Sequence, residues 1–381
     1  MSRIHLPAEL VLLILEQAYY DRRGFPDWHT LSACARVCTS WRPLAQRLLF
    51  HQVVVPGIHQ TSSTRESFRS TVLSTSDGGR ELASYIRRVD VTIRGPEDED
   101  NLVQLINHCH HLYELVLRAS GVHALRDVTM HALGSPLVID RPTPIRALFL
   151  SCGIQSPILY QLLAVWPTIQ FLRIGTELAA LPPKTLETKA KLYELVLYRL
   201  PSVRAMEWML SASDGSLRIL ECQVVPDARY DTILDAHTRH LQSLRVFHQT
   251  LRSRTFIHKC VNLQELMLAQ LSRFLPLGEI PETLEHVAFR QLPGVSDAIS
   301  TSIISAVDKL PRLRLMSCDA SARQSEHYPA LEEKCRKKRV LLDHNMVPIQ
   351  QVSSLRVCGR RPPKLNNSLL PCKVRGSHSF V

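Results

Sequence analysis

The sequence lacks the features that mark secreted, membrane-spanning or zinc-clustering proteins. Its ten cysteines include no CxxC pair, which argues against a disulfide framework or a four-ligand zinc site and favours reduced thiols in an intracellular protein. No apolar run approaches the roughly 18 residues of a membrane span. Glu9 and Glu16 interrupt the first apolar stretch, so we expect no signal peptide, no membrane association, and a cytoplasmic or nuclear location.

Enzyme signatures are also missing. There is no GxSxG, HExxH or GxGxxG pattern and no glycine-rich phosphate loop, so we predict no catalytic residues and no cofactor. A His-Cys-His-His run at 108–111 contains metal-ligand types, but neighbours at a helix end point in different directions, and we predict no metal site. An acidic run at 97–100 directly precedes a helical pattern and is expected to be a solvated helix start. A basic run at 336–339 fits a helix end, with a nuclear-import signal as the alternative.

Acidic residues are absent from positions 352–381, which hold six Lys and Arg. The formal net charge of the chain is +11, so this segment leaves only +5 for the other 351 residues. A folded body of such low charge is not expected to have nucleic acid as its main partner, although a nucleic-acid-associated protein using the basic tail stays an alternative. Pro, Ser, Asn and Arg dominate 352–381, which we predict to be largely disordered.

What the sequence does contain is a short helical module at its start. With 381 residues, 45% hydrophobic and 21% charged, the chain has the composition of an ordered protein of two or three domains. Pro7 and Pro43 each stand where a helix can begin, and Asp27 or Thr30 can cap the helix between them. The apolar residues exceed what so small a core can bury, so part of them is interpreted as a partner surface. The predicted helices cover 6–18, 31–41 and 43–50.

Several residues of this module stand at a family's characteristic positions: Leu6-Pro7, Glu9-Leu10, Ile14, Leu31, Val37-Cys38, Trp41, Leu44 and Phe50. They resemble an F-box, the domain by which a substrate receptor docks onto the Skp adaptor of a Skp–cullin–F-box ubiquitin ligase. The order of residues 31–41, with a trailing Leu-Leu-Phe, is similar to F-box proteins of mushroom-forming fungi, whereas the Tyr19 to His29 connection is longer than the family usually has. The alternative is that these residues are simply the core of a small helical domain. The resemblance implies a docking surface, with its support, made of Leu6, Pro7, Leu10, Ile14, Val37, Cys38, Trp41 and Leu44.

An internal repeat follows the module. Leu-Tyr-Glu-Leu-Val-Leu occurs at 112–117 and again at 192–197, and Leu-Gln-Glu-Leu-Met-Leu occurs at 263–268. The spacings between successive copies of the template L-x-x-L-x-L are 26, 33, 24, 23, 25, 24, 22, 21 and 26 residues, mostly in or near the period of leucine-rich repeats. Looser copies begin at Ile86, Ile145, Ile169, Leu217, Leu241, Leu284 and Leu310.

Helical patterns between these strands favour a parallel solenoid, with a helical repeat array as the alternative. Cys109 and Cys260 stand three residues before an anchor leucine, which resembles the cysteine-bearing leucine-rich repeats often joined to F-boxes. We place the 33-residue interval, with Pro142 and Pro144, on an inserted loop, and we expect a joining helix in 61–80 with a flexible end at 77–79. The predicted helices lie at 102–109, 158–166, 205–210 and 303–310, and short strands at 53–55 and 340–342.

Side chains alternate along a strand, so the residues between the leucines should form the concave face. Arginine and aromatic residues, which are enriched at interface hot spots, recur there. The mildly basic face is compatible with an acidic or phosphorylated substrate segment. One column is Val116, Phe149, Arg173, Val196, Glu221, Arg245, Met267, Ala288 and Arg314, and the next is Arg118, Ser151, Gly175, Tyr198, Gln223, Phe247, Ala269, Arg290 and Met316. Of these we predict as substrate-binding Phe149, Arg173, Tyr198, Glu221, Arg245, Phe247, Arg290 and Arg314.

The sequence therefore predicts an α+β multidomain protein, a three-helix F-box followed by an irregular α/β leucine-rich-repeat solenoid with a parallel sheet on its concave face. The expected function is that of a non-catalytic substrate receptor of a Skp–cullin–F-box ubiquitin ligase, which binds the Skp-type adaptor and, through it, cullin and a RING subunit. A Skp-binding scaffold or localisation protein outside a ligase is the alternative. The expected domains are 1–51 (F-box), 52–80 (linker), 81–351 (solenoid) and 352–381 (basic tail).

Overall fold

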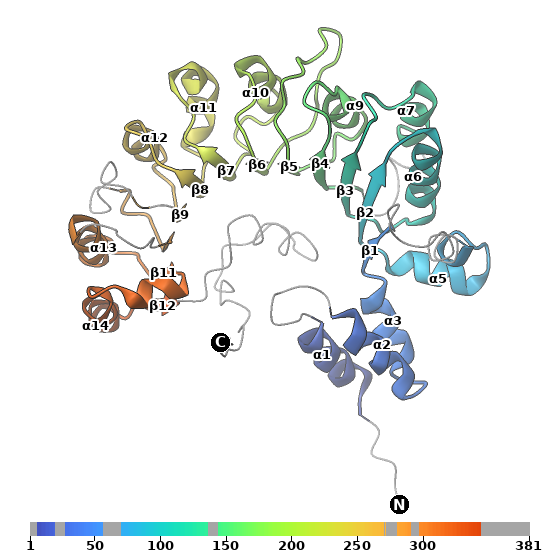
Figure 1. The fold of residues 1–381 in the computed structure, drawn as a ribbon, viewed down its shortest axis with the longest axis horizontal. Helices are drawn as coiled ribbons and strands as arrows, with labels where there is room; N and C mark the ends of the chain where they lie inside the picture. Colours follow the sequence, from blue (N-terminus) through green and yellow to red (C-terminus); the bar gives the residue numbers. More distant parts are fainter. Residues whose placement is uncertain are drawn as a thin grey trace, which may run out of the picture. The chain divides into compact units, whose positions relative to one another are not determined.

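The computed structural model describes residues 6–19, 27–55, 70–135, 144–269, 271, 280–290 and 297–343. These residues fall into two compact units: unit 1 holds those up to Gly121 together with 125–147, and unit 2 holds 122–124 and those from Leu148 onward. The fold mixes helices with one parallel sheet, whose strands follow one another in chain order from β1 to β12 without closing into a barrel (Figure 1). The predicted basic tail at 352–381, most of the proposed joining helix and Pro142 lie outside the described residues.

Unit 1 opens with three helices, whose buried apolar residues Val11, Leu15, Leu31 and Ala45 form one cluster. Asp27 caps the second helix, because its carboxylate accepts hydrogen bonds from both the backbone N–H and the hydroxyl of Thr30, at 2.9 and 2.8 Å. The helices are α1 (Ala8–Ala18), α2 (Trp28–Val37) and α3 (Arg42–Leu49).

The remainder of unit 1 alternates strands and helices. The parallel pairing of β1 with β2 and of β2 with β3 aligns Val53 with Val89 and Val89 with Leu115, which places these apolar residues in one layer of the core. The elements are β1 (Gln52–Val54), α5 (Asp77–Tyr85), β2 (Arg88–Ile93), α6 (Pro96–His108), β3 (Glu114–Ala119) and α7 (Asp127–Leu133).

One prediction for unit 1 was wrong and two were incomplete: the acidic run does begin helix α6, and the part of the 33-residue interval at 136–143 lies outside the described residues. The segment 77–79 is not a flexible end but the first turn of α5, which begins there because the Ser76 hydroxyl caps the N–H of Gly79 at 3.1 Å. The acidic run is only partly solvated, since Glu99 is buried and accepts from Thr129 Oγ1 at 2.6 Å and from the backbone N–H of Arg126 at 3.0 Å. The 33-residue interval is not merely a loop, because it contains α7, which Glu99 anchors.

Unit 2 repeats a strand followed, in most repeats, by a helix, and its helices lie on the outer side of the strand row (Figure 1). Parallel strands require such a crossover, because the chain must return to the same end of the sheet before each new strand. The strands are β4 (Ala147–Ser151), β5 (Phe171–Ile174), β6 (Glu194–Leu197), β7 (Ile219–Val224), β8 (Ser243–His248), β9 (Glu265–Leu268), β10 (His286–Phe289), β11 (Leu315–Cys318) and β12 (Leu341–Asp343). The helices are α9 (Ile158–Val165), α10 (Val203–Leu210), η1 (Ala228–Tyr230), α11 (Asp231–Thr238), α12 (Ser253–Lys259), α13 (Asp297–Lys309), η3 (Ala320–Gln324) and α14 (Tyr328–Lys338).

Buried leucines explain why the repeats stack. In the copy at 192–197, Leu192, Leu195 and Leu197 are buried, and the equivalent leucines of the copy at 263–268 are completely buried. The predicted cysteine positions share one geometry: Cys109 and Cys260 are each fully buried at the C-terminal cap of a helix. A small apolar side chain suits this position, because the chain turns there toward the next anchor leucine.

The last repeat is shifted by three residues from the predicted alignment. The backbone N–H of Arg314 donates to the carbonyl of Glu285 at 2.9 Å, just as the N–H of Glu285 donates to that of Gln264. Arg314 therefore occupies the position directly after the anchor leucine, and the anchor is Leu313 rather than Leu310. The reason is a longer repeat, since α13 alone spans 13 residues.

Candidate functional site

One side of helix α1 presents aliphatic side chains outward. Leu10 and Ile14 are each 48% exposed, and Leu6 and Leu13 are exposed as well, whereas Val11 and Leu15 are buried. Residues three and four apart lie on one face of a helix, so the exposed and the buried aliphatics occupy opposite faces. Clustered aliphatic side chains of this kind are typical of surfaces that take part in binding. We call Leu6, Leu10, Leu13 and Ile14 the α1 stripe.

The other predicted docking residues divide between surface and core. Val37, at the end of α2, is 63% exposed, and Cys38 and Pro7 are exposed too. The Cys38 thiol lies 3.1 Å from the Ser40 hydroxyl, and this hydrogen bond lowers the pKa of Cys38. Trp41 and Leu44 are half-buried and pack against the core cluster, so they support the helices more than they face outward.

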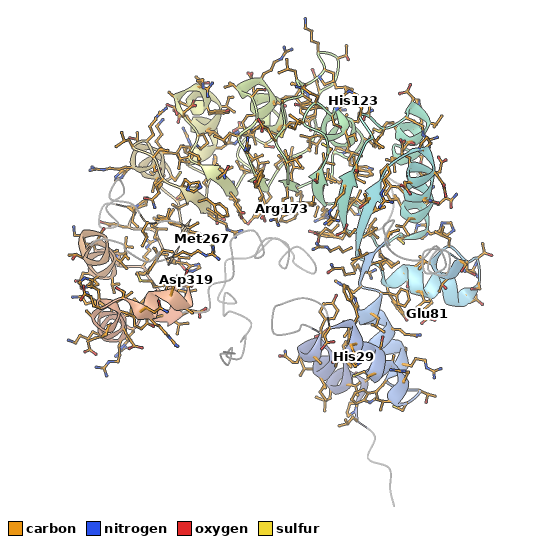
Figure 2. All side chains as sticks on the ribbon, viewed as in Figure 1. His29, Glu81, His123, Arg173, Met267 and Asp319 are labelled. Carbon is orange, nitrogen blue, oxygen red and sulfur yellow. The ribbon has the colours of Figure 1, made fainter. Side chains whose placement is uncertain are left out.

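In unit 2 the strand residues between the leucines lie on the inner side of the strand row, where Figure 2 labels Arg173 and Met267; some of them, such as Val196 and Met267, are buried. Arg173 of β5, Val196 of β6 and Glu221 of β7 are direct neighbours in the sheet register. Two strand spacings separate the backbones of Arg173 and Glu221 by about 10 Å. The smaller Val196 between them leaves a hollow.

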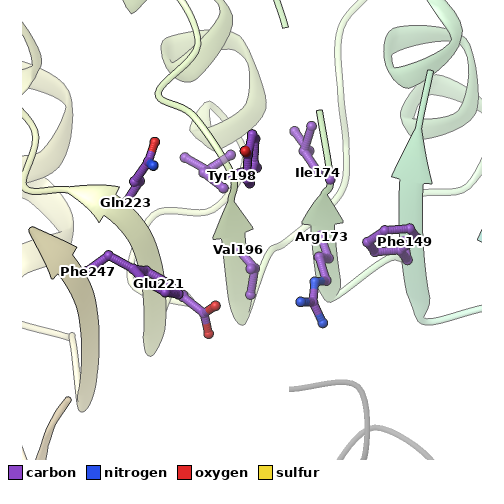
Figure 3. A pocket seen from close by; sticks show the side chains of 10 residues that line it. Phe149, Arg173, Ile174, Val196, Tyr198, Glu221, Gln223 and Phe247 are labelled. Atoms are coloured by element: carbon purple, nitrogen blue, oxygen red, sulfur yellow. The ribbon is translucent and has the colours of Figure 1, made fainter. Parts of the chain in front are cut away.

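This hollow is the centre of a cavity of about 290 Å³, which we call the trough. Figure 3 shows Arg173 and Glu221 directed to the same side of the sheet across Val196, with Phe149 beyond Arg173 and Phe247 beyond Glu221. The Arg173 guanidinium lies 5.5 Å from the centre of the Phe149 ring. The lining residues are Phe149, Arg173, Ile174, Gly175, Val196, Leu197, Tyr198, Glu221, Gln223 and Phe247.

Gly175 allows the aromatic wall of the trough to form. A Cβ atom at this position would lie 2.7 Å from Cζ of Phe149, closer than carbon atoms can approach. The ring therefore lies over the Gly175 backbone, which fixes its position next to Arg173. On the other side, Phe247 packs against Met267 and Ala269, which fixes the second aromatic wall.

A buried group of charges adjoins the trough. Arg245 is only 2% exposed, and its Nε donates to Glu265 Oε1 at 3.0 Å. Its Nη1 lies 3.6 Å from Glu221 Oε2 and 3.9 Å from Glu194 Oε1. Burial opposes the charge of Arg245, but the three carboxylates more than offset this, so its pKa is raised. Glu265 is also held by the Ser243 hydroxyl at 2.5 Å and by His286 Nδ1 at 3.3 Å.

Glu221 is the least satisfied member of this group. Its side chain is buried, and its Oε2 has no hydrogen-bond partner among the described residues. Burial raises the pKa of Glu221 to about 7 and nearby Glu194 adds to this, although Arg245 and Arg173 act in the opposite direction. A desolvated carboxylate at the wall of a cavity is a feature of binding sites more than of passive surfaces.

No known protein family and no curated protein matches this chain. The two surfaces must therefore be interpreted from their own chemistry. Among the described residues no three His, Cys, Asp or Glu side chains converge to hold a metal ion, and the 108–111 run instead caps a helix, with His108 Nδ1 2.9 Å from the Gln104 carbonyl. No helix in the described part of the chain is long and apolar enough to cross a bilayer.

The structure brings together most of the predicted concave residues. Phe149, Arg173, Tyr198, Glu221 and Phe247 line the trough, and Arg245 lies in the charge group beside it. The remaining two do not belong to this site. Arg290 is half-buried directly after β10, and Arg314 is exposed directly before β11, where its Nη1 lies 3.8 Å from Glu285.

Sequence reasoning missed the glutamates that neutralise the face. Glu114, Glu194 and Glu265 occupy the same position in the three best copies of the repeat, and each pairs with a cation on another strand. Glu114 pairs with Arg88 at 3.0 Å, while Glu194 and Glu265 both face Arg245. These glutamates could have been identified from the sequence, because they stand at the same position of the L-x-x-L-x-L template. These pairs remove much of the basic character that the arginines alone suggested.

Proposed function

We propose that this protein is a substrate receptor of a Skp–cullin–F-box ubiquitin ligase, with no catalytic residues of its own. The α1 stripe carries this proposal. Three of its four side chains, Leu6, Leu10 and Ile14, stand at positions that resemble an F-box, and all four are exposed to solvent where an adaptor would cover them. The trough on unit 2 supplies a second, chemically different surface for a target protein.

A receptor needs one surface for the adaptor and another for the target, and the two units carry two such surfaces. Unit 1 carries the aliphatic stripe, and unit 2 carries a cavity with aromatic and charged walls. A receptor raises the rate of ubiquitin transfer by holding the target close to the loaded conjugating enzyme, so it contributes effective concentration and not bond making. The cytoplasm or the nucleus is the proposed location.

The test is co-purification of the full chain with a Skp-type adaptor, cullin and a RING subunit. Leu10→Ala combined with Ile14→Ala should weaken adaptor binding at least tenfold, since each exposed leucine or isoleucine buried at an interface contributes about 1–2 kcal/mol. The matched control is Val128→Ala combined with Leu251→Ala, two exposed aliphatic side chains elsewhere on the surface. This control should bind the adaptor as the wild type does.

Each result has a defined meaning. A stripe variant with wild-type circular dichroism and undiminished adaptor binding would show that the F-box interpretation is wrong. Binding of the adaptor without cullin would instead favour the scaffold alternative. Loss of adaptor binding in both the stripe variant and the control would show that the effect is not specific to α1.

A further inference from the structure

The charges around the trough do not cancel. Three carboxylates, on Glu194, Glu221 and Glu265, face two guanidinium groups, on Arg173 and Arg245, which gives a formal balance of −1. Arg245 is shared among all three carboxylates, and its Nη1 makes no hydrogen bond among the described residues. Arg245 is thus already committed to the protein's own acids, Arg173 lies beside the Phe149 ring, and the formal surplus charge of the group is negative.

One of the three carboxylates belongs to the wall of the trough. Glu221 forms part of the trough wall, and its buried Oε2 makes no hydrogen bond within the described structure. Figure 3 shows its carboxylate directed to the same side as the Arg173 guanidinium. The Glu265 oxygens, by contrast, are held by Arg245, Ser243 and His286.

The remaining walls suit the stem of a long side chain. Phe149 and Phe247 stand at the two ends of the trough, and Val196 forms its floor. Aromatic faces attract cations and also pack against methylene groups. A volume of about 290 Å³ lies at the lower end of the range for small-molecule sites, so it fits one large side chain better than an extended ligand.

We propose that the trough binds a single basic side chain, lysine or arginine, of the target protein, with Glu221 as its counter-ion. This inference rests on the proposed function, because it names the class of segment that the receptor recognises. A phosphate or carboxylate group in the trough would be repelled by three nearby carboxylates. This repulsion disfavours the acidic target segment that the arginines of the concave face alone suggested. A purely apolar side chain would leave the buried Glu221 Oε2 without a hydrogen bond.

Binding should strengthen as the pH rises from 6 to 8. The groups facing Glu221 are Arg173 on β5, Glu194 on β6 and Arg245 on β8, and together with burial they keep the pKa of Glu221 at about 7. A cationic side chain binds the ionised carboxylate, so protonation of Glu221 below this pKa competes with the ligand. The affinity should fall up to roughly tenfold for each pH unit below 7.

The experiment uses the full chain and a Gly/Ser heptapeptide carrying one central Arg, Lys, citrulline or Glu, with binding followed by ligand-observed saturation-transfer NMR. We expect the Arg and Lys peptides to bind and the neutral citrulline and acidic Glu peptides to stay at background. Glu221→Gln should weaken the Arg and Lys peptides at least tenfold. Arg173→Gln should preserve or increase their affinity, since it removes a repulsive cation from the opposite wall.

Two results would overturn the inference: binding of the Glu peptide as tight as that of the Arg peptide, or unchanged Arg-peptide binding by Glu221→Gln. The peptide assay needs neither adaptor nor cullin, so its failure is distinguishable from failure of the proposed function. A wild-type protein that co-purifies with the adaptor but ignores the basic peptides would refute the inference about the target alone.

Discussion

Replacement of Glu221 by glutamine should make the protein more stable at pH 8. The pKa of Glu221 is raised from 4.5 to about 7, and one pKa unit corresponds to about 1.4 kcal/mol. Ionising this carboxyl group therefore costs about 3 kcal/mol more in the folded protein than in the unfolded chain. Glutamine has nearly the same shape and carries no charge, so Glu221→Gln avoids this cost.

The pH window follows from the direction of the shift. Below pH 4.5 Glu221 is protonated in both the folded and the unfolded state, and between 4.5 and about 7 only the folded state keeps the proton. The wild type therefore loses stability as the pH rises through this window and reaches a constant level above it. The variant should equal the wild type near pH 4.5 and exceed it by up to about 3 kcal/mol at pH 8.

Urea unfolding at pH 5, 6, 7 and 8, followed by circular dichroism, measures this difference as a shift of the midpoint at constant slope. Glu177→Gln is the matched control, because Glu177 is an exposed carboxylate paired with Arg199 at 2.7 Å. Surface pairs of this kind contribute little, so the control should stay within about 0.5 kcal/mol of the wild type. If Glu221→Gln is less stable than the wild type at pH 8, Arg245 depends on the Glu221 charge and the reasoning fails.

Three further outcomes are expected. Leu15→Ala should lower the free energy of unfolding by about 2–5 kcal/mol, because Leu15 is completely buried; a change below about 1 kcal/mol would contradict the described core. Gly175→Ala should cost about 1–3 kcal/mol by displacing the Phe149 ring, and in a double-mutant cycle the cost should largely vanish when Phe149→Ala is also present. Burial and nearby arginines lower the pKa of His51 from 6.5 to about 4, so the wild type should lose up to about 3 kcal/mol as the pH falls through that window. His51→Gln should flatten this acid dependence, and equally steep urea titrations for both proteins would exclude His51 as its source.

The repeat could be located from the sequence because the leucines that recur at a regular spacing are the same leucines that the fold buries. Where one copy follows another at an ordinary interval, as from Leu192 to Leu217, the leucine that the period predicts is also the leucine that is buried. The prediction failed at Leu310, because Leu310, Leu313 and Leu315 match the leucine template in full, whereas the observed repeat buries Leu313, Met316 and Cys318 at these positions. The pairing of Ala288 with Ser317 and the backbone hydrogen bond from Arg314 to Glu285 distinguish the two alignments, and such contacts between distant residues have no local sequence signature.

The trough could be predicted in its residues but not in its electrostatics. Alternation along the strands identified Phe149, Arg173 and Glu221 on one surface, because side-chain direction in a strand follows from position alone. Whether Arg245 meets solvent or a carboxylate depends on which side chains the next strands contribute, and no local pattern contains that information. The same limit applies to Gly79, whose place inside a helix depends on the Ser76 cap.

The close of the first helical hairpin has a practical consequence. The backbone N–H of Asp27 donates to the carbonyl of Tyr19 at 2.7 Å, so a hydrogen bond joins the two residues between which the connection from α1 to α2 runs. Lengthening a connection whose ends are already held together costs little, since loop-closure entropy grows only with the logarithm of length. The connection between Tyr19 and Asp27 should therefore tolerate an insertion. An affinity tag or a fluorescent domain placed there should leave the α1 stripe accessible, so that binding of a partner to the stripe can be followed.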